Sequence, residues 1–381
     1  MIIFNAFKIR FLLFFIVFFG ILSCNQNPSK KMQTLNAYSF YTGSYTNQQS
    51  KGIYKYTVYS DGNFENHGLM AACENPSFLE VSYHGQFLLA TNEVDLEGSG
   101  VIESYAIHAD TLKFISREFT AGAHPCHASI NDNNYVLTSN YSGGNVALYQ
   151  LNTNGKLGDF LDTANHYGSG QHPRQDAPHA HSAWFVPQSN EVIAVDLGTN
   201  ELWFYTLDTS KAKLISTEQQ KLAMEPEAGP RHLCFHPNGK WIYVLNELNN
   251  TICLVNRNSK GVYTRGTSVS TLPDDFTEFS KAAHILISND GNFIYASNRG
   301  HNSIAVFKVN QESGQLDLIE HVSTKGNSPR HFALTADEKI MVVANQDTDN
   351  LVSYVRNKKN GELAFAREIE AFSPTCVAFT K

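Results

Sequence analysis

The side chains best suited to proton transfer and anion binding recur in this chain at a regular spacing. A sequence that begins Gly229-Pro230-Arg231-His232 and ends at Asn246-Glu247 occurs in six similar copies, and a truncated seventh copy covers residues 373–379. Superimposing the copies gives a column of mostly His residues: Phe78, His127, His181, His232, His284, His331 and Cys376. Imidazole titrates near neutral pH, and guanidinium groups bind carboxylates and phosphates through paired hydrogen bonds. Gathered at one place, such residues can move a proton beside a bound anion.

The spacing of the copies predicts the fold. Neighbouring members of the His column lie 45 to 54 residues apart, and repeats of about 40–50 residues made of short strands are typical of β-propeller blades. In the fourth copy, two apolar strands at 233–235 and 241–245 flank a Pro-Asn-Gly turn, and residues 251–255 begin a third strand. The alternative is an open β-solenoid, whose repeats are usually shorter and need terminal caps.

The seventh copy ends after one strand, and its missing partners are found near the other end of the chain. Residues 37–45, 52–59 and 64–73 have the composition of strands. We therefore predict an all-β domain at 37–381, a seven-bladed β-propeller closed by pairing the C-terminal strand with the N-terminal strands. Closure of this kind protects strand edges that would otherwise be open to aggregation.

A second column ends the second strand of each copy and consists of Asn92, Asn140, Asp196, Asn246, Asn298 and Asn345. In an antiparallel hairpin the start of one strand lies beside the end of the next. Both columns should therefore share one mouth of the central channel, together with the residues that flank them, among which are Cys126, Arg231, Arg330, Glu93, Tyr141, Glu247 and Arg299. The amides of the second column are expected to cap the turn that follows the second strand.

The N-terminus has the features of an export signal. Lys8 and Arg10 precede an apolar run at 11–22, which is too short to span a membrane. The sequence Ile21-Leu22-Ser23-Cys24 resembles a bacterial lipobox, with a looser Leu22 than usual. We predict a lipoprotein signal peptide at 1–23, lipid attachment at Cys24, a polar tether at 24–36 and a lipid-anchored location on the periplasmic side of the inner or outer membrane. The alternatives are an ordinary signal peptide and an uncleaved anchor.

Composition argues against several classes of partner. The net charge is −7 and basic residues are not clustered, which disfavours nucleic-acid binding. Of six Cys, five remain after Cys24, an odd number at irregular spacing that does not indicate a disulfide framework. The alternative is a His-rich metal site from His124, His172, His179 and His181, but no compact His-x-x-x-His or Asp-rich loop occurs. We therefore expect no metal and no cofactor.

Several motifs resemble a known family. They are Tyr-Thr-Gly-Ser-Tyr-Thr at 41–46, His-Pro-Cys-His at 124–127, Asn-Tyr-Ser-Gly-Gly-Asn-Val at 140–146, Pro-His-Ala-His at 178–181, the Gly-Pro-Arg-His block at 229–247, and Ser-Pro-Arg-His at 328–331. Over about 41–379 the chain is similar to the seven-bladed lactonases, a family that includes propeller-type 6-phosphogluconolactonases and fungal carboxy-muconate lactonising enzymes. The resemblance implies that His181, Arg231, Glu247 and Arg299 are the catalytic residues.

The residues themselves leave the general base open. Glu247 is the best-placed carboxylate, but pairing with Arg231 should lower its pKa and weaken it as a base. His181 or His127 is the rival base. The arginines suit recognition of carboxylate or phosphate, and we expect further substrate contacts from His127, His232, Arg330 and Asn246. The alternative roles are purely structural: an inter-strand ion pair for Glu247 and Arg231, and packing on the inner strands for the His residues.

The resemblance implies hydrolysis of a sugar or organic-acid lactone, and most specifically of 6-phosphoglucono-1,5-lactone to 6-phosphogluconate. An extracytoplasmic location favours an unphosphorylated aldonolactone instead. The alternatives are lactone formation from an unsaturated diacid and a non-catalytic propeller that binds a glycan or a protein. An enzyme should have a narrow polar funnel at the mouth, whereas a binding scaffold should have a broad aromatic or apolar rim. Residues 166–178, an insertion rich in Gly and Pro, should form a loop at this mouth, either a lid or an ordinary flexible loop.

Overall fold

The computed structural model describes residues 35–46 and 49–381, and within these residues all regular structure is β-strand. The predicted signal peptide, Cys24 and all but the last two residues of the predicted tether lie outside the described residues. In the described part of the chain, no helix is present that could cross a membrane.

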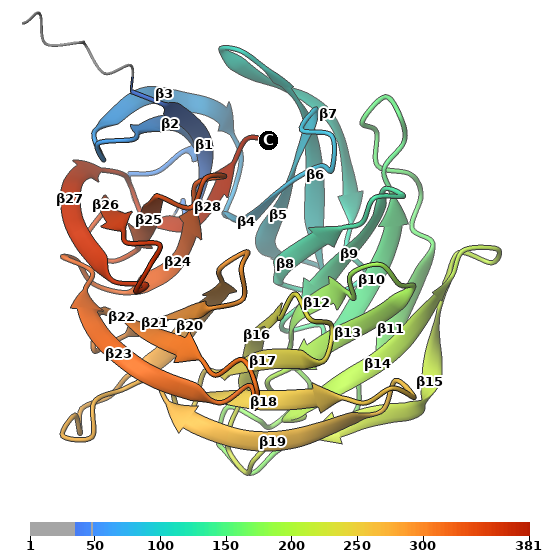
Figure 1. The fold of residues 1–381 in the computed structure, drawn as a ribbon. Helices are drawn as coiled ribbons and strands as arrows, with labels where there is room; N and C mark the ends of the chain where they lie inside the picture. Colours follow the sequence, from blue (N-terminus) through green and yellow to red (C-terminus); the bar gives the residue numbers. More distant parts are fainter. Residues whose placement is uncertain (1–34, 47–48) are drawn as a thin grey trace, which may run out of the picture. The chain divides into compact units, whose positions relative to one another are not determined.

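Seven four-stranded antiparallel sheets are arranged around a central channel (Figure 1). Blade 1 is β4 (Pro76–Val81), β5 (Phe87–Leu96), β6 (Ser99–His108) and β7 (Thr111–Phe119). Blade 2 is β8 (Pro125–Ile130), β9 (Tyr135–Asn140), β10 (Asn145–Gln150) and β11 (Asp162–Asn165). Blade 3 is β12 (Ala180–Phe185), β13 (Glu191–Asp196), β14 (Glu201–Asp208) and β15 (Lys213–Ala223). Blade 4 is β16 (Pro230–Phe235), β17 (Trp241–Asn246), β18 (Thr251–Arg257) and β19 (Tyr263–Ser270).

The last three blades complete the ring. Blade 5 is β20 (Lys281–Ile287), β21 (Phe293–Arg299), β22 (Ser303–Val309) and β23 (Leu316–Ser323). Blade 6 is β24 (Pro329–Leu334), β25 (Ile340–Asn345), β26 (Asn350–Arg356) and β27 (Leu363–Glu370). Blade 7 combines β28 (Pro374–Phe379) with β1 (Ala37–Ser44), β2 (Gly52–Tyr59) and β3 (Phe64–Ala72).

The ring closes as the sequence predicts. The C-terminal β28 pairs antiparallel with the N-terminal β1, with Phe379 opposite Phe40 and Cys376 opposite Gly43. In Figure 1 the red end of the chain lies beside its blue beginning. The prediction of a seven-bladed propeller with this closure is confirmed.

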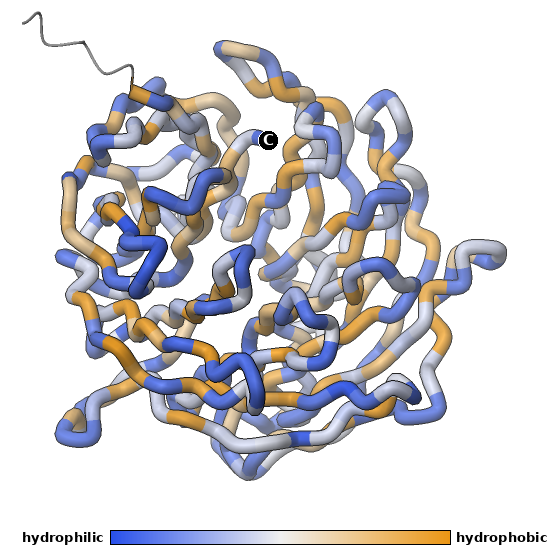
Figure 2. The backbone as a smooth tube through the Cα atoms, in the orientation of Figure 1, coloured by the Kyte–Doolittle hydropathy of each residue, from blue (hydrophilic) through white to orange (hydrophobic). Residues whose placement is uncertain are grey.

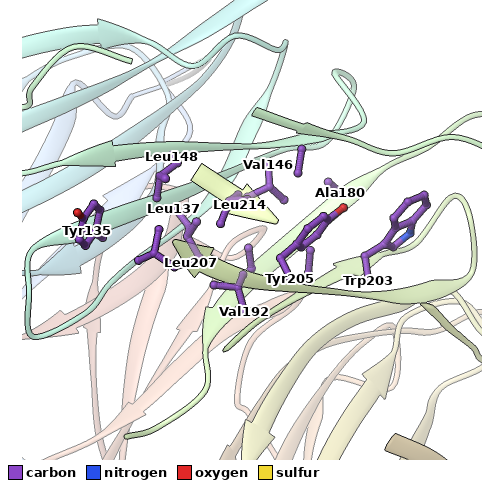
Figure 3. Packing of buried hydrophobic residues seen from close by; sticks show 13 residues of the cluster. Tyr135, Leu137, Val146, Leu148, Ala180, Val192, Trp203, Tyr205, Leu207 and Leu214 are labelled. Atoms are coloured by element: carbon purple, nitrogen blue, oxygen red, sulfur yellow. The ribbon is translucent and has the colours of Figure 1, made fainter. Parts of the chain in front are cut away.

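The apolar core lies between the blades. Among the described residues, seven clusters of buried hydrophobic side chains occur, one at each junction of neighbouring blades. Figure 3 shows the junction of blades 2 and 3, where Leu137 and Val146 meet Val192 and Tyr205. Hydrophobic positions run along the strands, whereas most connecting loops are hydrophilic (Figure 2). Full burial of such a side chain contributes about 1.5–3 kcal/mol, so packing between blades holds the inner strands in register around the channel.

Each inner strand contains a β-bulge near its start. The bulge determines which side chains face the mouth and which face the channel. In blade 4, Pro230 pairs with Asn246 and His232 with Leu245, which leaves Arg231 as the extra residue. Corresponding register shifts occur in the inner strands of all six remaining blades. The extra residue of a bulge is unpaired and re-aimed relative to its neighbours. The bulge column is Ser77, Cys126, His181, Arg231, Ala283, Arg330 and Thr375.

The register corrects the sequence alignment in blade 3. Ala180 pairs with Asp196 and Ser182 with Val195, so His181 belongs to the bulge column with Arg231, not to the His column. The alignment failed there because His181 was matched to the His of the other copies, although it lies three residues after Pro178 and not two. Ser182 occupies the channel position of this blade.

The Asn column is structural, and its side chains bond both to the turn that follows, as expected, and to the connection that enters the blade. Most of its amide groups donate to the connection that enters the blade from the previous outer strand: Asn92 to Glu74 O, Asn140 to Thr120 O, Asn298 to Thr271 O and Asn345 to Thr324 O, at 2.7–2.9 Å. The expected bonds to the turn also occur: the amides of Asn140, Asn246 and Asn298 donate to Asn145 Oδ1, Thr251 Oγ1 and Ser303 Oγ just past it, and Asp196 Oδ1 accepts from Thr199 N. The bonds to the entering connection fasten neighbouring blades together around the mouth.

Candidate active site

A small polar pocket opens at the mouth where the bulge column and the second strands meet. It encloses about 190 Å³ and is lined by Tyr45, Glu93, Cys126, Tyr141, Arg174, His181, Glu247, Lys281, Arg299 and Arg330. We call it the mouth pocket. A larger hollow of about 430 Å³ lies between the outer parts of blades 3 and 4, but it contains none of the candidate residues. The mouth pocket therefore matches the expected narrow, charged funnel.

Glu247 occupies the centre of this pocket and is surrounded by cations. Its Oε1 accepts a hydrogen bond from Arg174 Nη1 at 2.6 Å, and its Oε2 lies 3.1 Å from Arg231 Nε and 2.9 Å from Arg299 Nη2. Burial opposes ionisation of this carboxyl, but Arg299 and Arg231 outweigh burial and hold the pKa of Glu247 well below its ordinary value. Glu247 is thus ionised and fully engaged, which makes it a poor proton acceptor.

Backbone bonds at the end of β17 fix the position of Glu247. Its N–H donates to Gly229 O at 2.7 Å, and Leu248 N donates to Ala228 O at 3.1 Å. Gly229 has φ of 61°, and a Cβ there would lie 2.4 Å from the Leu248 side chain. Space therefore favours Gly at 229, whereas the positive φ alone does not, because Asn75, His124 and Ser328 adopt it at the equivalent positions of other blades.

Arg231 lies behind Glu247 and does not itself line the pocket. Its guanidinium contacts Glu247, His232 Nε2 at 3.0 Å and the carbonyl oxygen of Ala283. Burial, followed by the charges of Arg299 and Arg330, lowers the pKa of Arg231 to about 9. The side chain therefore remains a cation at neutral pH and positions Glu247 from below.

His181 lies beside Glu247 and faces the pocket. Its Nε2 is 3.7 Å from Glu247 Oε2, and its Nδ1 is 3.6 Å from Cys126 Sγ. Burial, and then the charge of Arg231, lowers the pKa of His181 well below its ordinary value, against the opposing effect of Glu247. The imidazole is therefore neutral at pH 7 and free to accept a proton, with a carboxylate in place to stabilise the cation that forms.

Arg174 reaches the pocket from the 166–178 insertion. Its Nη2 donates to Tyr141 Oη at 3.0 Å, and the Tyr141 ring stacks on His179 at 4.5 Å between centroids. The turn that carries Arg174 is held by the buried Gln175, whose amide donates to Leu197 O at 2.9 Å. These contacts place the side chain of Arg174 on Glu247.

The insertion is also tied down at its beginning. His166 Nδ1 lies 2.6 Å from Asp196 Oδ2, and both side chains are fully buried, with the imidazole stacked on Trp203. Asp196 Oδ1 also accepts from His179 N at 2.9 Å. Blade 3 therefore has Asp196 in the column whose other members are Asn, and its carboxylate bonds to both His166 and His179 N.

A second ionic group lies on the other side of the pocket. Arg330 Nη2 donates to Tyr45 Oη at 2.7 Å, and Tyr45 Oη donates to Glu93 Oε2 at 2.8 Å. Arg330 also lies 3.7 Å from Glu93 Oε2. Arg330 therefore lines the pocket as predicted, although its charge is already partly balanced.

Beneath the mouth, a layer of rings fills the channel. It is formed by Phe78, His127, Trp184, His232, His284 and His331. His232 Nδ1 lies 2.9 Å from His284 Nδ1, and the rings of His284 and His331 stack at 3.9 Å. Burial is the main cause that lowers the pKa of each of these four His residues, to about 3 for His127 and His331. The layer is therefore uncharged at neutral pH.

The structure thus gathers some predicted residues and separates others. His181, Glu247, Arg299 and Arg330 line the pocket, with Arg231 directly behind. His127 and His232 lie in the channel layer, and Asn246 is buried against its turn; none of these three lines the pocket. In the described part of the chain, no three His, Cys, Asp or Glu side chains are arranged to hold a metal ion.

Comparison with known proteins identifies the family. A sequence model described as "Lactonase, 7-bladed beta-propeller" matches residues 39–379. The chain belongs to the seven-bladed propeller lactonases. This lactonase is 37% identical, over 351 residues, to the 6-phosphogluconolactonase of Bacillus subtilis (strain 168), a match that covers 91% of this chain and 99% of the relative.

Solved structures agree with this assignment. The Pseudomonas aeruginosa periplasmic gluconolactonase PpgL is 28% identical with a TM-score of 0.86, covering 91% of this lactonase and 99% of that chain. A protein from Lactobacillus plantarum is 32% identical with a TM-score of 0.85, covering 91% of this chain and all of that one. The chain is therefore a lactonase along its whole propeller, and the mouth pocket is its candidate active site.

Six pocket residues were not among the predicted site residues. Glu93, Cys126 and Tyr141 were expected at the mouth without a site role, and Tyr45, Arg174 and Lys281 were not expected there. Tyr45 belongs to a motif that carried the family resemblance, but it lies before the first copy, directly after the strand that completes the truncated seventh copy, and so had no column. Arg174 lies in an insertion, where the repeat offers no alignment. Lys281 begins the fifth copy, two residues before the aligned bulge position. Its place in the pocket follows from its pairing with Arg299 across β20 and β21, which the alignment does not show.

The buried His layer leads to a testable acid sensitivity. The pKa of His127 is lowered from 6.5 to about 3 in the folded lactonase. Below pH 6.5 the unfolded chain therefore binds a proton at this residue that the folded protein does not bind. The free energy of unfolding must then fall as the pH decreases through this window. We expect His127→Phe to reduce this pH slope by about 1.4 kcal/mol per pH unit between about pH 6 and about pH 4, measured by urea unfolding.

The Phe side chain should be accommodated because Phe78 occupies the matching position in blade 1. Trp184→Phe is the control, since it alters packing against the same ring without changing a titratable group. It should lower stability at all pH values and leave the slope unchanged. An unaltered slope in His127→Phe would show that the channel His is not the source of the acid sensitivity.

Proposed function

We propose that this lactonase hydrolyses the ring ester of an aldonolactone, with 6-phosphoglucono-1,5-lactone as the leading substrate and 6-phosphogluconate as product. The observation that carries the proposal is the excess of positive charge in the mouth pocket, where Arg174, Lys281, Arg299 and Arg330 face only two carboxylates, Glu93 and Glu247. Such a pocket favours an anionic substrate. The name of the Bacillus subtilis relative supports the phosphorylated lactone.

In the proposed mechanism, His181 takes a proton from water as the water oxygen bonds to the lactone carbonyl carbon. Arg299, which lines the pocket, stabilises the oxyanion that forms, and Glu247 stabilises the imidazolium at His181 Nε2. The bond between the carbonyl carbon and the ring oxygen then breaks. The proton passes from His181 to that oxygen, which leaves a hydroxyl group and a carboxylic acid that ionises.

Hydrolysis by the purified protein tests this proposal. Acid release from 6-phosphoglucono-1,5-lactone and from glucono-1,5-lactone would be followed above the spontaneous rate, with and without a chelator. We expect both to be hydrolysed, the phosphorylated lactone with the higher kcat/KM, and no loss on chelation. Failure to accelerate either reaction would refute the proposal, and loss of activity on chelation would refute its metal-independent form.

We also propose that the enzyme is exported and held at the periplasmic side of a membrane by lipid on Cys24. This is supported by the basic residues Lys8 and Arg10, the apolar run at 11–22 and the lipobox-like sequence ending at Cys24. The similarity to a periplasmic gluconolactonase is also in keeping with it. Equal kcat/KM values for the two lactones would make a plain aldonolactone the physiological substrate at this location.

Substitution of Cys24 tests the anchor. In cells fed a labelled fatty acid, the wild-type protein should carry label and sediment with membranes, whereas Cys24→Ser should be unlabelled. Cys73→Ser, which alters a cysteine within the propeller, is the matched control and should remain labelled. An unlabelled wild-type protein would exclude lipid attachment at Cys24.

A further inference from the structure

We propose that Lys281 and Arg174 form a subsite for the remote anionic group of the substrate, a phosphate monoester, separate from the Glu247 centre that handles the lactone carbonyl. This inference rests on the proposed function and names the residues that would decide its substrate class. The inference rests on which cations of the mouth pocket remain available to a ligand.

Two of the four lining cations are already committed. Arg299 Nη2 contacts both Glu247 and the Ala282 carbonyl oxygen, and the side chain is 9% exposed. Arg330 is engaged with Tyr45 and Glu93. Withdrawing Arg330 would leave Glu93 and Tyr45 without their cation, and withdrawing Arg299 would remove one of the two cations that hold Glu247 Oε2, which is costly for buried groups. Arg299 Nε has no partner among the described residues, so it can donate to the lactone oxyanion while the guanidinium stays on Glu247.

Lys281 has no such partner. In residues 35–46 and 49–381, no carboxylate forms an ion pair with its ammonium group, although it lines the pocket and is only partly exposed. It stands at the start of β20, directly across from Arg299. Burial, followed by the charge of Arg299, lowers the pKa of Lys281. A partly buried cation beside other cations is unfavourable unless an anion joins it, so a bound anion would relieve a strain that the free site carries.

Arg174 is the second available cation. Its side chain is 38% exposed, against 3% for Arg231, and it comes from the 166–178 loop instead of an inner strand. It contacts Glu247 through Oε1 alone, while Arg231 and Arg299 hold Oε2. Glu247 would therefore keep two cations if Arg174 turned toward a ligand. Arg174 and Lys281 line the same pocket of about 190 Å³, so one bound anion can lie between them.

The two side chains differ in a way that suits a phosphate monoester. A guanidinium presents a planar fork to two phosphate oxygens, and an ammonium acts as a compact point charge. A dianionic phosphate would neutralise both cations, whereas a neutral hydroxymethyl group would leave them uncompensated. The subsite should therefore discriminate the phosphorylated lactone from the plain one.

The test compares the two lactones in variants of the full-length protein. Lys281→Gln and Arg174→Gln are each expected to lower, by about ten- to a hundredfold, the ratio of kcat/KM for 6-phosphoglucono-1,5-lactone to that for glucono-1,5-lactone, because charge-assisted hydrogen bonds are the strong ones. Arg174→Lys should recover part of the ratio. Lys308→Gln, at an exposed position of β22, is the matched control and should leave both rates unchanged.

Binding of inorganic phosphate, measured by calorimetry, separates this inference from the proposed function. The wild-type protein should bind phosphate, and Lys281→Gln should bind it at least tenfold more weakly, even if neither lactone is hydrolysed. A ratio of kcat/KM that stays unchanged in both variants would overturn the subsite. So would phosphate binding that is absent from the wild type or equal in the wild type and Lys281→Gln.

Discussion

Replacing Glu247 with Gln is expected to reduce lactone hydrolysis by about a thousandfold or more, one of the two largest effects that the mouth pocket predicts. The carboxylate holds Arg174, Arg231 and Arg299 together and faces His181 Nε2. A neutral amide cannot balance three guanidinium groups or stabilise an imidazolium. The measurement is kcat and KM for the better of the two lactones, with kcat carrying most of the loss.

Stability should fall as well, since removing one partner of a buried ion pair leaves the other charge uncompensated. We expect Glu247→Ala to lower the free energy of unfolding by about 3–5 kcal/mol in denaturant titrations. A phosphate-containing buffer should restore part of this loss if an anion can take the place of the carboxylate.

A matched control separates catalysis from folding. Glu338 is also buried and paired with an arginine, with its Oε2 3.4 Å from Arg356 Nη1, and it lies at the end of the blade 6 hairpin away from the mouth. Glu338→Gln should be destabilising but should keep kcat within a factor of about two to three of the wild type. If Glu247→Gln kept kcat within tenfold while Glu338→Gln behaved as expected, Glu247 would be a structural residue only.

The architecture of this lactonase was readable from the sequence because the repeat imposes it. Each blade buries its faces only against its neighbours, so the same short pattern must recur, and a C-terminal copy with a single strand requires partners from the N-terminus. The pairing of β28 with β1 confirms that argument. The same logic located Glu247 and Arg299, each of which follows or ends a second strand at the mouth.

The finer arrangement of the site depended on a feature that the repeat does not reveal. A bulge adds one residue to a strand, and shifting a strand by one residue moves every side chain to the opposite face. His127 and His232 look equivalent to His181 in a sequence alignment, yet they point into the channel while His181 joins Arg231 in the bulge column. Only the pairing register shows this difference. Arg174 could not be placed from the repeat at all, because its loop occurs in one blade.

The register also decides which residue should act as the base, and this gives the second large effect. We expect His181→Ala to lower kcat by about a hundred- to ten-thousandfold, with little change in KM because the anion-binding cations remain. Added imidazole should restore part of the rate, which would not happen if the side chain only supported packing. His179→Gln is the control: His179 stacks on Tyr141 nearby but has no contact with Glu247, and its substitution should cost less than about tenfold.

The pH dependence of the wild type provides an independent check on His181. A base is active when deprotonated, and burial, followed by the charge of Arg231, holds the pKa of His181 well below its ordinary value of 6.5. The kcat/KM should therefore stay level as the pH falls through 6.5 and decline only in more acidic solution.

A substrate anion bound at Lys281 and Arg174 would raise the pKa of His181 by partly neutralising the nearby cations. The kcat for the phosphorylated lactone should then decline at a higher pH than the kcat for the plain lactone, because kcat reports the enzyme–substrate complex. Coincident declines would indicate that the bound anion does not communicate with the base. A decline centred on 6.5 in kcat/KM for the plain lactone, which has no titrating phosphate, would indicate a different, exposed base.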